Sequence, residues 1–417
     1  MELFMKKAFL LLLILLNFGI NLYAQNSINF SGEIATKWGV CAPWTDSDKS
    51  AGKFTAGNTN FTGTIDAYSG NSSAFAKGVI SYDALTKSVN FSLGELWADY
   101  TSSFWGIRIG RQKIVWGKAD GIDITNVVCP SDMSSIAAMT SDDSKLPVDA
   151  IRLSFSGNQF TADAFWIPFF TPALLPAEQV AGLPIEKPEL AIWNGEYGLK
   201  LSGYFSMFDL SLYGFYGWED TPFVDYKINM SNPTTVIPSA KYKHMAMVGL
   251  DTAIPIGPTV LRSEAAFFPK RHFQKNAQTI VKENMTGKAE TTKELNQLNA
   301  LIGLDWMPSG WTLTAQYFCD YVFGNLNNLD RKKAYTHGAT LSISKSLLNE
   351  TMDLSLAGVV NFNAFDSLIN PSLSYSLSDQ INLETGAYIL LPGPDEDGTY
   401  GAYKDYSTIY INVKFSM

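Results

Sequence analysis

The sequence predicts an all-β fold, a single transmembrane antiparallel β-barrel of about eighteen strands, within a range of sixteen to eighteen. The first observation is the alternation of apolar and polar side chains, as in residues 408–417, where Ile409, Ile411 and Val413 share one face and Tyr410 and Asn412 share the other. The second is the repetition of this pattern after residue 25, with tight and long connections in alternation. The third is a secretory signal ahead of it, a combination typical of membrane barrels.

The first 24 residues predict a signal peptide, and residues 25–417 predict one outer-membrane barrel domain. Lys6 and Lys7 precede an apolar run at residues 8–16, and the small residue Ala24 stands before the expected cleavage point. The competing interpretation is a membrane anchor, but about nine clean apolar residues are too few to cross about 30 Å of hydrocarbon. We therefore expect an exported chain.

The strands themselves are expected wherever a segment of about nine to eleven residues, enough to span a bilayer, alternates in polarity. We expect them near residues 28–40, 60–68, 73–83, 88–100, 104–117, 147–156, 159–170, 195–206, 208–218, 243–255, 259–269, 295–307, 311–323, 334–345, 351–362, 367–378, 381–391 and 407–417. With an even number of strands, the first strand begins and the last strand ends on the same side of the membrane. The signal peptide and the closing strand indicate that this side is the periplasm.

The connections support this topology. With the amino end in the periplasm, the outer connections include the long ones, at 41–59, 118–146, 171–194, 219–242, 270–294 and 392–406. The periplasmic connections include tight Gly, Asn, Pro and Ser turns at 69–72, 156–158 and 308–310. Short periplasmic turns with long outer loops are typical of barrels in the outer membrane of Gram-negative-type cells.

Side-chain phase predicts which residues face lipid. In the strand near 311–323, Trp311, Leu313 and Tyr317 are expected to face out, with Thr314 and Gln316 inward. Aromatic residues near strand ends predict an interfacial girdle: Trp38, Trp97, Tyr100, Trp105, Trp116, Trp166, Trp218, Trp306 and Trp311. The competing interpretation, the core of a soluble sheet protein, does not explain the alternating connections.

Charge and cysteine content narrow the partners. The net charge of -9 and the absence of a basic stripe argue against nucleic acid. The three cysteines, Cys41, Cys129 and Cys319, are widely spaced and predict neither a disulfide framework nor a metal-ligand pair. We expect no cofactor and no metal site.

The strongest family signal lies in residues 93–132. It contains an arginine–glutamine pair at Arg111 and Gln112 and a tryptophan–glycine pair at Trp116 and Gly117, ahead of a Pro-x-Asp at 130–132. Runs at 166–172 (WIPFFTP) and 198–203 (GLKLSG) follow. In this order the motifs resemble a broad, mostly uncharacterised family of bacterial outer-membrane β-barrel proteins that is distantly similar to the alginate-export porins. The resemblance implies a barrel of about eighteen strands that conducts a solute.

The chain departs from that family at two places. Cys129 stands before Pro130 where the family has asparagine, and Met417 ends the chain where a barrel-assembly signal usually ends in an aromatic residue. Met417 keeps the apolar phase of the closing strand, so that we still expect insertion by the barrel-assembly machinery.

Catalytic signals are weak, and we expect that the chain is not an enzyme. None of the three histidines, His244, His272 and His337, lies in a nucleophile elbow or a zinc-binding motif. One alternative stays open, in which His337 and a strand serine such as Ser342 assemble a lipase-like pair.

The lumen is where we expect function. Strand phase predicts that four basic side chains point inward: Arg108, Arg152, Lys200 and Arg262. Arg111 and Lys113 also belong to this set unless the chain near Gly110 shifts their phase. Such a basic arc favours anionic solutes, because charges at a constriction select ions by sign. The alternative is that the arginines pair with lumen acids and brace the wall. A possible inward-folding loop at 118–146 contains Asp120, Asp123, Asp132, Asp142 and Asp143, so that an acid–base constriction can form.

These observations predict a porin-like channel for passive passage of small, preferentially anionic solutes. Its expected partners are outer-membrane lipid, the barrel-assembly machinery through the closing strand, and the solute. The alternative function is a surface-exposed binding or adhesion barrel with a blocked lumen.

Overall fold

The computed structural model describes residues 26–42, 50–141, 144–228, 236–285, 290–395 and 398–417. The signal peptide expected at residues 1–24 lies outside these ranges, as do Asp142 and Asp143.

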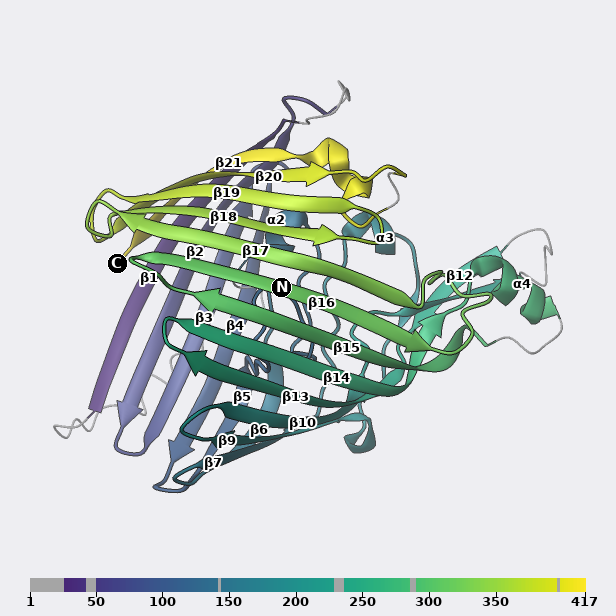
Figure 1. The fold of residues 1–417 in the computed structure, drawn as a ribbon, viewed down its shortest axis with the longest axis horizontal. Coiled ribbons are helices and arrows are strands. Elements are labelled where there is room, and N and C mark those ends of the chain that lie inside the picture. The colour runs from purple at the N-terminus through teal and green to yellow at the C-terminus, as the bar shows by residue number, and fades with distance from the viewer. Residues whose placement is uncertain (1–25, 43–49, 142–143, 229–235, 286–289, 396–397) are drawn as a thin grey trace, which may run out of the picture.

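The described chain forms a closed antiparallel β-barrel of eighteen strands (Figure 1). Each strand pairs with the next along the wall, and β1 also pairs with β21, with Glu33 opposite Ser416 and Cys41 opposite Thr408, which closes the ring. The wall consists of β1 (Asn26–Cys41), β2 (Phe54–Ser69), β3 (Ser72–Asp83), β4 (Ser88–Thr101), β5 (Trp105–Gln112), β6 (Val148–Ser156), β7 (Phe160–Ile167), β9 (Glu196–Tyr204), β10 (Asp209–Trp218), β13 (His244–Ile256), β14 (Thr259–Gln274), β15 (Thr292–Trp306), β16 (Trp311–Phe323), β17 (Tyr335–Leu347), β18 (Met352–Asn361), β19 (Asp366–Ser376), β20 (Ile381–Leu391) and β21 (Thr408–Ser416).

All eighteen expected strands are present, so the predicted fold class is confirmed. One difference in bounds changes the interior of the barrel: β5 ends at Gln112 instead of near residue 117. The chain leaves the wall there and turns into the barrel interior, where Trp116 is buried. By contrast, β2 and β14 extend several residues into segments expected as loops.

The two ends of the barrel differ as predicted. At one end, which we call the turn end, the eight connections are 70–71, 102–104, 157–159, 205–208, 257–258, 307–310, 348–351 and 377–380. At the other, the loop end, most connections are long, with short exceptions at 84–87 and 362–365.

The loop end also holds a separate three-stranded sheet of β8 (Ile185–Glu186), β11 (Phe223–Ile228) and β12 (Val236–Lys241), beside helix α4 (Ala277–Met285). Asn284 on α4 donates a hydrogen bond to the Tyr226 carbonyl at 2.6 Å. The remaining helices are short: α2 (Ile136–Met139), α3 (Ala177–Val180), η1 (Ile192–Asn194) and η2 (Gly401–Tyr406). Among the described residues, no helix is both long and apolar enough to cross a membrane.

The predicted faces of the strands are also confirmed. On β16, Trp311 is 45% exposed on the exterior, whereas Thr314 and Gln316 are 7% and 4% exposed inside. The expected aromatic girdle is wrong for Trp116, which is buried inside the barrel because it follows the end of β5. Trp97 also faces inward, since the guanidinium carbon of Arg108 lies 3.8 Å from its ring centre.

Candidate channel constriction

Residues 113–141 and 144–147, which we call the inward segment, fold into the barrel interior. Trp116 packs against Tyr213 and Phe165 with ring centres 4.9 and 5.4 Å apart. Around it, buried apolar side chains of the segment and of β6, β7, β10 and β13–β15 form one cluster. The segment's Cys129 belongs to this cluster, and burial raises the pKa of its thiol to about 11. This side of the lumen is therefore filled.

One carboxylate holds the tip of the inward segment. Glu264 on β14 is 2% exposed and accepts backbone N–H groups of Lys118, Ala119 and Thr125, together with the Thr125 hydroxyl at 3.0 Å. Gly117 has φ +86, and a Cβ there would lie 2.8 Å from the Glu264 carboxylate. A glycine is required because it allows this close approach in the left-handed region.

Two further wall residues hold the same tip. Arg262 on β14 donates to the Lys118 carbonyl at 2.7 Å. Gln316 on β16 donates to the Asp120 carbonyl at 2.6 Å and accepts the Asp120 N–H at 3.0 Å. Because β16 is eight steps from β5 around an eighteen-strand ring, the segment crosses nearly the whole interior.

The crossing brings Lys118 into an acidic part of the wall. Its Nζ lies 3.6 Å from Asp251 Oδ1 and 3.7 Å from an Asp209 oxygen. Asp251 and Glu264 are directly opposite each other on β13 and β14. Like charges in that arrangement repel, so Lys118 stabilises the pair. Arg262 makes an ion pair with Asp305.

Toward the turn end, Arg108 and Arg152 face each other across β5 and β6. Arg108 Nε lies 3.1 Å from Asp99, and Arg152 Nη2 lies 2.8 Å from Asp163. Both arginine side chains are 30% exposed, whereas the aspartates are 16% and 17% exposed. They border a small polar pocket that also includes Ser102 and Ser154. The guanidinium groups at this pocket are therefore more exposed than the carboxylates.

The other predicted basic residues are placed differently. Lys200 on β9 faces the lumen directly opposite Tyr213, with its Nζ 5.5 Å from the Tyr213 ring centre. Arg111 has the strand phase of Ile109, which is 50% exposed on the exterior, and it pairs with Asp149 at 3.2 Å. The register of β5 is unbroken here, so Arg111 lies on the opposite face from Arg108. Lys113 follows the end of β5, where its backbone N–H donates to Glu95.

The predicted aspartates do not form an acid–base pair with Arg108 or Arg111 within the described ranges. Asp120 is held at its backbone by Gln316. Asp123 pairs with Lys145, and Asp132 accepts a hydrogen bond from the Ser134 N–H at 3.0 Å within its own turn. The contacts that place the segment come from Glu264, Gln316 and Lys118 instead. The glycine at 117 is the one sequence signal that marks this tip.

The alternative lipase-like pair is not assembled. His337 has the outward phase on β17 and bonds Tyr317, whose ring is 38% exposed, whereas Ser342 has the inward phase. The sheet separates the two side chains. In the part of the chain that the structure describes, no cluster of three or more His, Cys, Asp or Glu residues is arranged to hold a metal.

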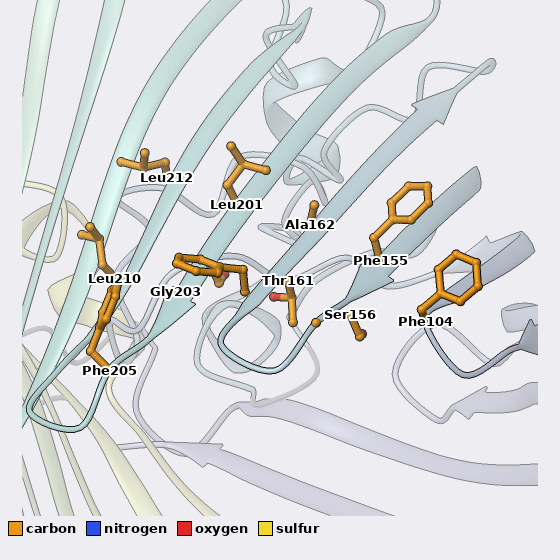
Figure 2. A pocket seen from close by; sticks show the side chains of 13 residues that line it. Phe104, Phe155, Ser156, Thr161, Ala162, Leu201, Gly203, Phe205, Leu210 and Leu212 are labelled. Atoms are coloured by element: carbon orange, nitrogen blue, oxygen red, sulfur yellow. The ribbon is translucent and has the colours of Figure 1, made fainter.

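A pocket of about 570 Å³ lies outside the lumen, on the barrel exterior near the turn end. Figure 2 shows Phe155, Leu201 and Leu212 along this outer wall, with Ala162 between the larger side chains. The concavity arises where small residues alternate with large ones on the apolar exterior.

Comparisons with known proteins agree with the fold. The profile of a family described as "Protein of unknown function (DUF1302)" matches residues 44–376. Among solved structures, Pseudomonas aeruginosa OccK3 (OpdO) matches with a TM-score of 0.55 at 9% identity, over 94% of this chain and 96% of that chain. P. aeruginosa OccK2 (OpdF), solved with glucuronate, matches with a TM-score of 0.53 at 11% identity over 94% and 97%.

Acinetobacter baumannii OccAB1 matches with a TM-score of 0.52 at 9% identity over 94% and 96% of the two chains. A comparison with curated protein sequences finds no match.

Proposed function

The chain belongs to the DUF1302 family, and from this premise and its fold we propose that it is a porin-like channel of the outer membrane. One observation supports this most strongly: the inward segment fills one side of a closed eighteen-strand barrel, while the inward faces of β17–β19 keep partly exposed polar side chains. A passage beside a fixed constriction is the arrangement that a selective pore requires.

The same proposal includes orientation and export. Residues 1–24 have the pattern of a signal peptide, the turn end faces the periplasm and the loop end faces outward. The outward face of β21 is the surface that the barrel-assembly machinery would meet. The likeness to alginate-export porins that the sequence suggested stays a prediction.

We further propose that small anionic solutes are favoured. Arg108 and Arg152 are directly opposite one another and more exposed than the aspartates they pair with, so that a solute carboxylate can bridge them. The ion pairs also fit the alternative in which these arginines only stabilise the barrel wall. Solute binding and wall stabilisation predict different results in one experiment.

That experiment measures reversal potentials across a salt gradient in planar bilayers. Arg108→Gln with Arg152→Gln should lower the anion-over-cation permeability ratio by about twofold or more, and high salt should reduce the difference by screening. The matched control is Lys187→Gln with Lys227→Gln, which removes two positive charges at the loop end, one directly after β8 and one on β11. An unchanged ratio in the arginine variant would mean that Arg108 and Arg152 brace the wall.

A further inference from the structure

Serines recur at alternate positions on one side of the lumen. Ser342, Ser344 and Ser346 share the inward face of β17, and Ser372, Ser374 and Ser376 share the inward face of β19. Between them, β18 contributes Ser355. We call the inward faces of β17–β19 the serine wall. Along the barrel, β17–β19 are the third to fifth strands after β14, the strand that contains Glu264.

The register aligns these hydroxyls into a row. Ser344 is directly opposite Thr312 on β16 and Ser355 on β18, and Ser355 is directly opposite Ser372 on β19. Side chains opposite one another on the same face of a sheet are about 5 Å apart. Four hydroxyls therefore follow each other across four neighbouring strands.

Three of these hydroxyls have unused hydrogen-bonding capacity. Ser344, Ser355 and Ser372 are partly exposed, and within the described parts of the chain their hydroxyls bond no other residue. Their neighbours differ, because Ser346 donates to Asp353 at 2.5 Å and Ser374 bonds Asn382 at 3.0 Å.

The serine wall is also nearly free of charge. On β17 every inward residue is Gly, Ser or Thr. Within the described lengths of β18 and β19, the charged inward residues are Asp353 at the turn end and Asp366, fully buried at the loop end. This contrasts with β5–β7, where Arg108, Arg152 and Asp163 line the lumen. A hydroxyl both donates and accepts hydrogen bonds, and a row without net charge does not select ions by sign.

We propose that the row Ser344, Ser355 and Ser372 is a binding track for neutral polyhydroxylated solutes such as sugars. This inference rests on the proposed channel function and deepens it. The solute hydroxyls exchange water for the serine hydroxyls as they pass, which replaces hydrogen bonds that entry into the narrow lumen removes. Neutral and anionic solutes then use different walls of one pore.

The test compares two triple variants in liposome-swelling assays with glucose and gluconate. Replacing Ser344, Ser355 and Ser372 by Ala removes the hydroxyls and widens the pore, and replacing all three by Thr keeps the hydroxyls and narrows it. If hydroxyls matter, the Ala variant should slow glucose entry by about threefold to tenfold, and the Thr variant should retain it. Gluconate entry should be nearly unchanged in the Ala variant.

The opposite order, with faster glucose entry through the Ala variant and slower entry through the Thr variant, would show that size alone decides and would overturn the track. Equal glucose rates in all three proteins would overturn it as well. Both variants are first checked for folding by heat-modifiable migration on a detergent gel. Absence of ion conductance in the unmodified protein would refute the channel itself, a result distinct from loss of the sugar track.

Discussion

Replacing Glu264 by glutamine should release the inward segment. The carboxylate accepts donors from Lys118, Ala119 and Thr125, two on each oxygen. Glutamine keeps one acceptor oxygen and puts an N–H2 group where the other oxygen is, so that two contacts are lost. Hydrogen bonds to a charged group contribute about 1.5–3 kcal/mol each. Relief of the repulsion with Asp251 offsets part of that loss, and we expect a net cost of about 3 kcal/mol.

A free thiol inside the segment reports the release. Cys129 is 1% exposed, and its raised pKa of about 11 leaves about one thiol in a thousand ionised at pH 8. In a background with Cys41→Ser and Cys319→Ser, a polar maleimide should label Cys129 slowly. A cost of about 3 kcal/mol shifts the anchored-to-released ratio about a hundredfold, so that Glu264→Gln should speed labelling by at least about tenfold.

The control for this experiment is Glu384→Gln. Glu384 on β20 accepts hydrogen bonds from Tyr410 at 2.9 Å and from Asn412, both on β21, so that the same change of charge occurs away from the segment. Equal labelling rates for Cys129 in the parent and in folded Glu264→Gln would refute the view that this carboxylate holds the constriction.

Three further predictions follow from the same geometry. Gly117→Ala should speed Cys129 labelling as Glu264→Gln does, because the new Cβ would lie 2.7 Å from Thr125 Oγ1 at φ +86; an unchanged rate would contradict the tight fit. Leu341→Arg, on the exterior, should cost about 2–4 kcal/mol of unfolding free energy in liposomes if it lies near the bilayer midplane, and Ser342→Arg should cost much less; equal costs would refute the face assignment. Unboiled protein should migrate differently from boiled protein on a detergent gel because the closed ring leaves no strand edge, and identical migration with a helix-rich circular dichroism spectrum would exclude the barrel.

The strands of the wall could be predicted from sequence because each one has a recognisable pattern in its own residues. Alternation with period two, interrupted by tight turns, is a property of neighbouring residues, and it identified β16 with both of its ends. The same rule failed after Gln112. Residues 113–116 continue to alternate, with Ile114 and Trp116 on one face, and nothing local distinguishes them from a wall strand.

What decides the path of the inward segment is a carboxylate far away in sequence. Glu264 accepts a hydrogen bond from the Lys118 N–H, 146 residues away in the sequence, and periodicity contains no information about such contacts. The sequence leaves the roles of Arg108 and Arg152 open for a related reason. Their partners Asp99 and Asp163 lie on neighbouring strands, and the pairing depends on a register that a slip of one residue would reverse.

Single-channel recording of the refolded protein in planar bilayers is the most direct test of whether a passage remains open beside the inward segment. We predict discrete, ohmic conductance steps, with increased current noise in Glu264→Gln because the constriction is no longer held. A folded, heat-modifiable barrel that gives no conductance steps in either protein would contradict an open passage and would favour a binding barrel with a blocked lumen.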